Sequence, residues 1–225
     1  MNYSDIKNNE EVKELIRKGN QDLGVLGYTD HSETHCVMVA QRAAFVLKKF
    51  GYSEQEQELA KIAGYMHDIG NIVNRIEHAQ SGAVMAFRIL LGLDMPSDDV
   101  AAIVTAIGNH DEGTGVPVSA VAAALILGDK SDVRRSRVRL SDTRSKTDMI
   151  NVNDIHDRVN YAVTENSTAI DTEEKTFTLS LTIDTEISPV IEYFEIFTNR
   201  MKLCTRAAES MGLQFKLFIN NTSLI

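Results

Sequence analysis

The chain has 225 residues, of which 43% are hydrophobic and 24% are charged, as in an ordinary globular protein. Its formal net charge of -9 excludes a surface that attracts a nucleic-acid polymer or an anionic membrane as a whole, so a phosphate-bearing ligand has to meet a local positive feature. The two cysteines lie far apart, the N-terminal segment has no apolar core typical of a signal peptide, and the longest apolar run is too short to span a membrane. We expect a cytoplasmic protein with reduced thiols and a small ligand.

Helices dominate the sequence from about residue 30 to residue 132, where apolar residues recur at intervals of three and four. Capping residues and prolines predict where five helices begin: after Asp30, after Ser53, at about Glu77, after Pro96 and at Pro117. Glycines predict where the first four of them end: Gly51, Gly70, Gly92 and Gly108. This part of the chain is therefore predicted to be all-helical.

A polar, arginine-rich segment from Asp132 to Asp148 predicts a loop or a solvated helix end. We place a boundary near it, with one unit at residues 1–148 and a smaller one at residues 149–225. In the smaller unit, Thr176–Asp184 alternates apolar and polar residues and predicts a half-buried strand. The turn-forming residues of Asp171–Lys175 make the preceding segment its expected hairpin partner.

The end of the chain adds one long amphipathic helix, from Pro189 to Met211, and a second alternating segment at Gln214–Ile219. We expect the strands to form one layer of sheet under this helix. Such a small core is marginal alone, so the appendage is expected to dock on the helical part or on a second copy, with a homodimer the first hypothesis. The predicted fold class is mainly α, a helical bundle with a small C-terminal α+β appendage.

His67 and Asp68 are adjacent at the predicted end of the second helix, where Gly70 turns the backbone away. A neutral imidazole and a carboxylate suit a divalent transition metal, but two ligands make a poor site. Further ligand-type residues lie on the other predicted helices: His35, His78, His110 and Asp129. The helix is therefore predicted to end on His67 and Asp68 because that end faces a metal.

This ordered series resembles the HD-domain superfamily of metal-dependent phosphohydrolases, of the HDIG type. The resemblance depends on "HCVMVAQRA" at His35, "HDIG" at His67, "EHAQSGA" at Glu77, "AIGNHDE" at Ala106 and "GDKSD" at Gly128. It covers about the first two-thirds of the chain and implies an HD-domain helical bundle. It also implies that His35, His67, Asp68 and Asp129 form a basic metal site. The additional ligands of two-metal members would be His78 and His110, with Asp68 bridging.

The sequence departs from two branches of this superfamily. Asp111 follows His110 where the branch that cleaves cyclic dinucleotides has a second histidine, and no GYP motif follows. Asn71 stands where that branch has a lysine, so we expect phosphate to be bound elsewhere, with Arg75, Lys130 and Arg134 as candidates. The Glu-Asp pair of the branch that hydrolyses stringent-response alarmones has no convincing counterpart.

Several residues have simpler interpretations. His31 is either a hydrogen-bonded core residue or a residue of the site, and His156 is expected at the surface. Cys36, next to His35, is either a ligand or a small core residue, of which the second is the commoner case. The arginines at positions 134, 135, 137 and 139 either bind phosphate or belong to a solvated face.

The sequence and the resemblance together predict a phosphohydrolase that acts on a nucleotide or another small phosphoester through a metal-activated hydroxide. Asp68 and Lys130 are the expected catalytic residues. One or two divalent ions are expected, and histidine and carboxylate ligands leave open whether they are Mn, Fe, Co, Ni, Zn or Mg. The alternative is a catalytically inactive, metal-containing regulatory module that senses a ligand.

Overall fold

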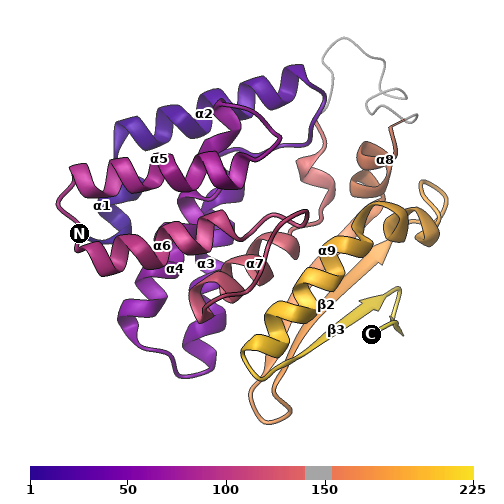
Figure 1. Cartoon of the computed structure of the whole chain (residues 1–225). Helices are drawn as coiled ribbons and strands as arrows, with labels where there is room; N and C mark the ends of the chain where they lie inside the picture. Colours follow the sequence, from indigo (N-terminus) through magenta and orange to yellow (C-terminus); the bar gives the residue numbers. More distant parts are fainter. Residues whose placement is uncertain (140–153) are drawn as a thin grey trace.

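The computed structural model describes residues 1–139 and 154–225 (Figure 1). The chain is mainly helical, with a small sheet near its C-terminal end, as predicted. The predicted boundary between residues 148 and 149 and most of the predicted polar loop lie outside the described residues. Within the described ranges, no helix has the length and apolarity needed to cross a membrane.

The helical part contains two helices that the sequence analysis did not predict, α1 and α2, before the predicted series begins. Its elements are α1 (Tyr3–Lys7), α2 (Glu10–Val25), α3 (Glu33–Lys49), α4 (Glu54–Met66), η1 (Ile69–Ile72), α5 (His78–Gly92), α6 (Ser97–Gly108), α7 (Ala120–Lys130) and η2 (Arg135–Arg137). Helix α3 packs against α4 and α7, α5 packs against α6, and α2 covers η1 (Figure 1). The ends of several helices consequently meet near the middle of the molecule.

Two of the predicted helix starts are displaced, each for a local reason. Helix α3 begins after Ser32 rather than after Asp30, because the Asp30 carboxylate accepts hydrogen bonds from the backbone and hydroxyl of Ser32 and so closes a turn before the helix. Helix α7 begins after Ser119 rather than at Pro117, since the Ser119 hydroxyl accepts from the backbone N–H of Ala122. The predicted cap at Ser53 is confirmed and forms a capping box with Glu56.

The glycine of the HDIG sequence, Gly70, allows η1 to lie directly against the start of α5. A Cβ atom at Gly70 would collide with the carbonyl oxygen of His78 and would lie 2.5 Å from the backbone nitrogen of Gly82. Only glycine fits such a close approach of two backbones. The packing fixes the position of Asp68, just before η1, relative to His78, the first residue of α5.

The C-terminal part is a mixed four-stranded sheet with two helices. Its elements are α8 (Ile155–Ala162), β1 (Val163–Asp171), β2 (Thr176–Ile183), α9 (Val190–Ser210), β3 (Gln214–Ile219) and β4 (Thr222–Ser223). The strand order is β1-β2-β3-β4, with β1 and β2 antiparallel as the predicted hairpin. Strands β2 and β3 are parallel, with Phe177 opposite Phe215, because α9 returns the chain to the end of the sheet from which β2 started.

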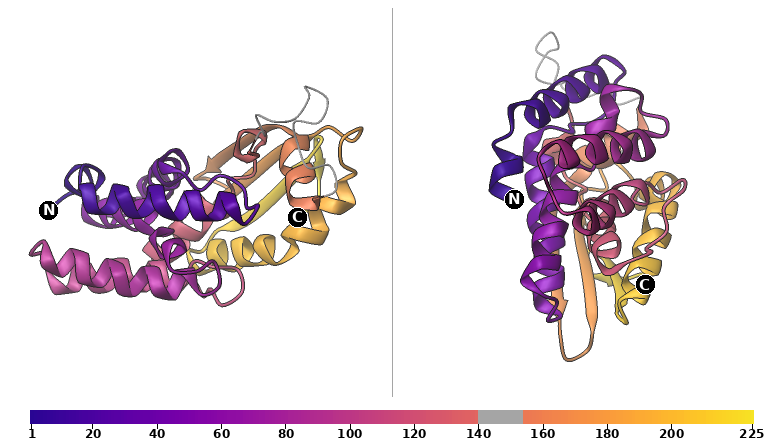
Figure 2. Two further views of the ribbon diagram at one scale, coloured as in Figure 1. Left: turned by 90° about the horizontal axis from the view of Figure 1, so that it is seen from above. Right: turned by 60° about the vertical axis from the view of Figure 1, so that its left-hand side comes forward.

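Helix α9 lies alongside the sheet and against the helical part (Figure 2). One of its faces packs on β2 and β3, and another packs on α7. Its buried residues, including Phe197, Met201 and Cys204, belong to one continuous hydrophobic core that also contains residues of α3, α4 and α7. The appendage therefore docks on the helical part, one of the two arrangements that its marginal size predicts.

Candidate metal centre

Six side chains from five segments converge where the helices of the N-terminal part end. They are His35 in the first turn of α3, His67 and Asp68 after α4, His78 at the start of α5, His110 after α6 and Asp129 in the last turn of α7. All six are buried. The structure thus brings together every ligand that the sequence and the resemblance proposed.

Four of these side chains form the first ligand group. Nε2 of His35 lies 3.7 Å from Oδ2 of Asp68 and 3.4 Å from Oδ1 of Asp129. Nε2 of His67 lies 3.2 Å and 3.7 Å from the same two oxygens. Atoms that bind one ion at about 2.1 Å are themselves about 3 to 3.5 Å apart. The first ligand group therefore has the spacing of a single metal site.

The second ligand group shares Asp68. Its other oxygen, Oδ1, lies 3.4 Å from Nε2 of His78, which in turn is 3.2 Å from Nε2 of His110. Asp111, where the cyclic-dinucleotide branch would have a histidine, has Oδ1 4.0 Å from the same His78 nitrogen. Each oxygen of the Asp68 carboxylate consequently faces a different group of imidazoles.

Hydrogen bonds at the far side of the imidazole rings fix their tautomers. The Nδ1 atoms of His67, His78 and His110 lie 2.8, 3.0 and 2.6 Å from the carbonyl oxygens of Gly64, Arg75 and Ile107. A carbonyl only accepts, so each Nδ1 carries the proton and each Nε2 presents a lone pair to the centre. This arrangement of donor and acceptor is usual for histidines that ligate a metal.

Three atoms at the centre provide a test of whether a metal fits. Nε2 of His35, Nε2 of His67 and Oδ2 of Asp68 are fully buried and, among the described residues, have no hydrogen-bond partner. Buried polar atoms without partners are costly, and a divalent cation would satisfy all three at once. Imidazole nitrogen and carboxylate oxygen suit Mn, Fe, Co, Ni and Zn. The residues present therefore fit a divalent metal.

The pKa values of His110, Asp68 and Asp129 favour their metal-binding forms, whereas that of His67 is raised, because the effect of burial is outweighed by the carboxylates of Asp68 and Asp129. Burial lowers the pKa of His110, and the nearby charge of Lys130 lowers it further, so the ring is neutral at pH 7. Burial alone would raise the pKa values of Asp68 and Asp129. The neighbouring His67 nevertheless holds the pKa of Asp68 well below its ordinary value, and Lys130 does the same for Asp129. Both carboxyl groups are therefore ionised.

Lys130, which was expected to act in catalysis and in phosphate binding, is engaged by carboxylates. Its ammonium lies 2.8 Å from Oδ2 of Asp129 and 2.7 Å from Oε2 of Glu112. Arg134 is also engaged, since its Nε donates to Oδ1 of Asp132 at 2.7 Å, and it does not line the cavity described below. Of the three proposed phosphate-binding residues, only Arg75 lines that cavity.

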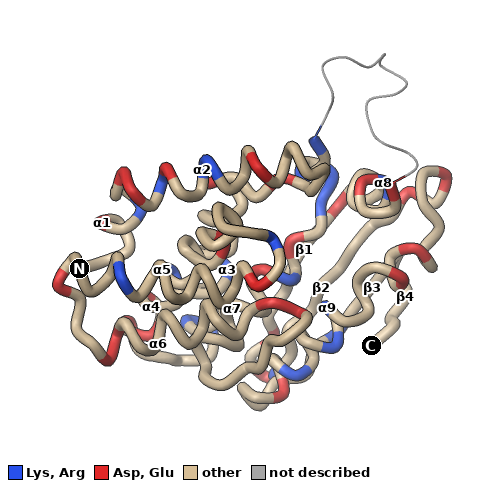
Figure 3. Tube along the Cα trace, turned by 45° about the horizontal axis from the view of Figure 1, so that its top comes forward, with Lys and Arg blue, Asp and Glu red and all other residues tan. Residues whose placement is uncertain are grey.

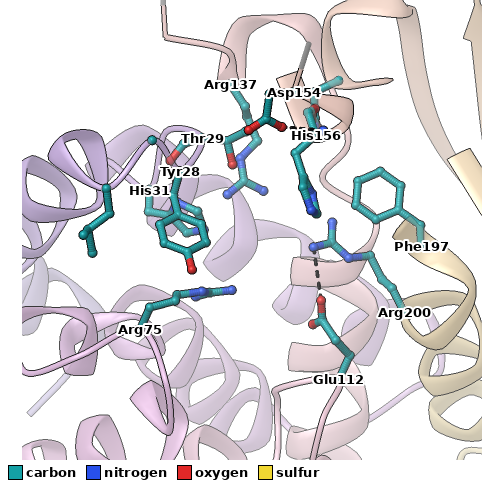
Figure 4. A pocket seen from close by; sticks show the side chains of 13 residues that line it. Tyr28, Thr29, His31, Arg75, Glu112, Arg137, Asp154, His156, Phe197 and Arg200 are labelled. Carbon is teal, nitrogen blue, oxygen red and sulfur yellow. Dashed lines mark hydrogen bonds and ion pairs between the residues drawn. The ribbon is translucent and has the colours of Figure 1, made fainter. Parts of the chain in front are cut away.

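The cavity has a volume of about 390 Å³ and is lined by residues of both parts of the chain (Figure 4). Its cationic and aromatic lining includes Tyr28, His31, Arg75, Arg137, Phe197 and Arg200. Figure 4 shows the three arginines pointing into it from three different sides. The size is that of a small-molecule site, and the arginines supply the local positive feature that a net charge of -9 requires for an anion.

The arginine series after α7, a basic stretch in Figure 3, does not form a solvated face. Arg137 is buried, and its Nε and Nη1 donate to the carbonyls of Asp30 and Asp132 at 3.0 and 3.1 Å. Arg139 donates from Nε to the carbonyl of Tyr28 at 2.9 Å. These two arginines fix the segment before α3, which carries His31 into the cavity wall.

Sequence reasoning missed Arg200 of α9 altogether. Its Nη2 lies 3.4 Å from Oε1 of Glu112, and its guanidinium lies 4.3 Å from the ring centre of Phe197. The available signal was its position: an arginine three residues after Phe197 and four before Cys204 lies on the apolar face of the helix. His156, expected at the surface, is exposed and lies at the cavity.

Comparison with known proteins places these observations in a family. An uncharacterized protein of Methanocaldococcus jannaschii, MJ1020, is 26% identical to this chain over 162 residues. The match covers 62% of this chain and 62% of that protein, which is less than two thirds of the relative. The crystal structure of a predicted HD superfamily hydrolase from an uncultured Thermotogales bacterium has a TM-score of 0.44 and 22% identity, over 55% of this chain and 67% of its own. Residues 33–149, a little over half of the chain, match the HD domain, and the protein belongs to that family.

Proposed function

We propose that this protein is a metal-dependent phosphohydrolase that acts on a nucleotide or another small phosphoester. The observation that carries the proposal is the placement of Asp68, whose two oxygens face two groups of buried imidazoles whose Nε2 atoms carry lone pairs. The cavity lined by arginines next to this centre supports a phosphorylated ligand.

Within this proposal His35, His67, Asp68 and Asp129 hold one divalent ion, and His78 and His110 complete a place for a second with Asp68. Bound divalent ions supply a water molecule that is activated for attack at neutral pH, and they offset negative charge on the phosphoryl oxygens. The protein holds the ligands still, because each imidazole is fixed from behind by a hydrogen bond.

The arginines and Lys130 have different roles in the proposal. Arg75, Arg137 and Arg200 bind phosphate oxygens, since all three point into the cavity. Lys130 acts indirectly, because its ion pair with Oδ2 of Asp129 leaves Oδ1 directed at His35. It keeps the metal ligand oriented and does not meet the substrate.

The cavity also limits the class of substrate. A volume of about 390 Å³ accommodates a mononucleotide or a sugar phosphate, and the rings of Tyr28 and Phe197 offer apolar surface to a base or a sugar. The net charge of -9 disfavours a nucleic-acid polymer. We therefore propose a small phosphomonoester or nucleotide as the substrate class.

The test is phosphate release by metal-free protein reloaded separately with Mn, Fe, Co, Ni, Zn or Mg. Substrates would be nucleoside mono-, di- and triphosphates and sugar phosphates, with Asp68→Asn as the inactive control. Turnover of at least one substrate that depends on metal and is lost in the control is expected. Full metal occupancy with no turnover of any substrate would instead favour the regulatory module that senses a ligand.

A further inference from the structure

The two ligand groups differ in how a positively charged side chain of the protein contacts them. In the first group, Lys130 pairs with Oδ2 of Asp129 and leaves the oxygen that faces His35 free. In the second group, Nη1 of Arg75 lies 3.1 Å from Nε2 of His78 and 3.8 Å from Oδ1 of Asp68. Arg75 therefore contacts the same two atoms that a second metal ion would bind.

The contact between Arg75 and His78 uses the lone pair that a metal needs. Nδ1 of His78 carries the proton, because it donates to the carbonyl of Arg75, so Nε2 accepts from the Arg75 guanidinium. A nitrogen lone pair cannot serve a guanidinium and a metal ion together, and the two positive charges repel each other at this distance. An arginine cannot lose its proton to relieve the repulsion.

The side chain of Arg75 is also able to leave this position. It belongs to the segment between η1 and α5, and it is 22% exposed and lines the cavity. Its hydrogen bond to Oδ1 of Asn71 is long at 3.3 Å, and its guanidinium lies 5.9 Å from the ring centre of Tyr28. An anion in the cavity offers the guanidinium a stronger partner than a neutral imidazole does.

We propose that Arg75 competes with the second metal ion for Asp68 and His78, and that an anionic phosphate ligand in the cavity relieves this competition. The inference deepens the proposed function by assigning a form of regulation to the same centre. The first ion binds whether or not phosphate is present, whereas the second binds tightly only when Arg75 turns to the phosphate. By linkage, the second ion and the phosphate strengthen each other's binding.

Metal binding alone tests this inference, without any need for turnover. Mn²⁺ is titrated into metal-free protein, with the bound ions counted by elemental analysis and affinities measured by calorimetry. In Arg75→Gln, the Kd of the second ion should fall by about tenfold or more, and that of the first should stay within about twofold. The control, Arg88→Gln, changes an exposed arginine of α5 and should alter neither. His110→Ala should abolish the second event and so identify it.

A second arm adds inorganic phosphate as the probe. In the wild type, phosphate should lower the Kd of the second ion, and in Arg75→Gln the same addition should have a clearly smaller effect. Arg75→Lys keeps a charge but loses the planar fork, and should lie between the two. An unchanged or weaker second ion in Arg75→Gln would overturn the inference, as would an equal phosphate effect in both proteins. Failure of the phosphohydrolase assay with these effects intact would overturn only the proposed function.

Discussion

Asp132 accepts a hydrogen bond from Nδ1 of His35 at 2.7 Å, although 97 residues separate the two in sequence. Asp132 is fully buried and also forms ion pairs with Arg134 and Arg137. Burial alone would raise the pKa of its carboxyl group, but the hydrogen bond from His35 and the charge of Arg137 hold that pKa far below its usual range. It is therefore an ionised carboxylate that orients a proposed metal ligand, His35, from behind.

Replacing Asp132 by Asn should weaken the first metal site by about 10- to 100-fold, because an amide can present either its oxygen or its NH₂ group to His35 and no longer carries charge. Competition with a chromogenic chelator measures this affinity. Asp22→Asn, at an exposed position of α2, is the matched control and should leave it unchanged. Equal affinities in wild type and Asp132→Asn would show that Asp132 has no role in orienting His35.

Gly70→Ala should destabilise the protein by about 3 kcal/mol or more, because the new methyl group has backbone atoms of His78 and Gly82 in its way. Gly92→Ala, at the end of α5, has open space around its Cβ and should instead stabilise by up to about 1 kcal/mol. Urea unfolding of both variants measures the change. A Gly70→Ala protein as stable as the wild type would show that η1 and α5 are able to separate at little cost.

Arg200→Gln should raise KM by about tenfold for whichever phosphoester is turned over, with the metal content unchanged. The reason is that Arg200 reaches the cavity from α9 but contacts none of the proposed metal ligands. Steady-state kinetics with elemental analysis on the same samples separates the two effects. Lys202→Gln lies on the exposed side of the same helix and should behave as wild type.

Both cysteines should be unreactive in the folded protein. Burial raises the pKa of Cys204 to about 12, and it also raises the pKa of Cys36. Neither thiol should react with an alkylating reagent at pH 8, whereas both should react after unfolding. Mass spectrometry of the labelled protein counts the adducts. An adduct on either native thiol at pH 8 would contradict the burial.

The raised thiol pKa values also contribute to the dependence of stability on pH. A thiol whose folded pKa is above its unfolded value of about 8.5 binds its proton more tightly in the folded state. Its contribution to stability is therefore complete below about pH 8.5 and is lost as pH rises toward about 12, the pKa of folded Cys204. Cys204→Ser should show a shallower loss of stability over this alkaline window.

Local patterns were enough to predict the helices from α3 to α7 and the β1–β2 hairpin. The cap at Ser53, the alternation of Thr176–Asp184 and the proline before α9 are all features of short segments. Parallel pairing of β2 with β3 was not predicted, because it depends on where α9 carries the chain and no short segment records it. Helix α2 was missed although it has one apolar face, which packs on η1.

The proposed ligands were identified from their order in the sequence. The residues that support them could not be identified in this way. Asp132 and Arg200 act through contacts that span 97 and 88 residues, to His35 and to Glu112. Lys130 shows the converse: its place next to Asp129 suggested contact with substrate, whereas Glu112 approaches from another segment and completes its pairing. The sequence identifies the types of residue, whereas the tertiary fold decides which charged side chains are paired within the protein and which are available to a ligand.

The position of α9 has a consequence for how the protein matures on the ribosome. Every proposed metal ligand, from His35 to Asp129, has been synthesised before the first residue of α9 emerges. The centre can therefore assemble before Phe197 and Arg200 close the cavity beside it. A nascent chain at that stage carries all the proposed ligands but lacks one wall of the cavity, which is completed last, when α9 docks on α7.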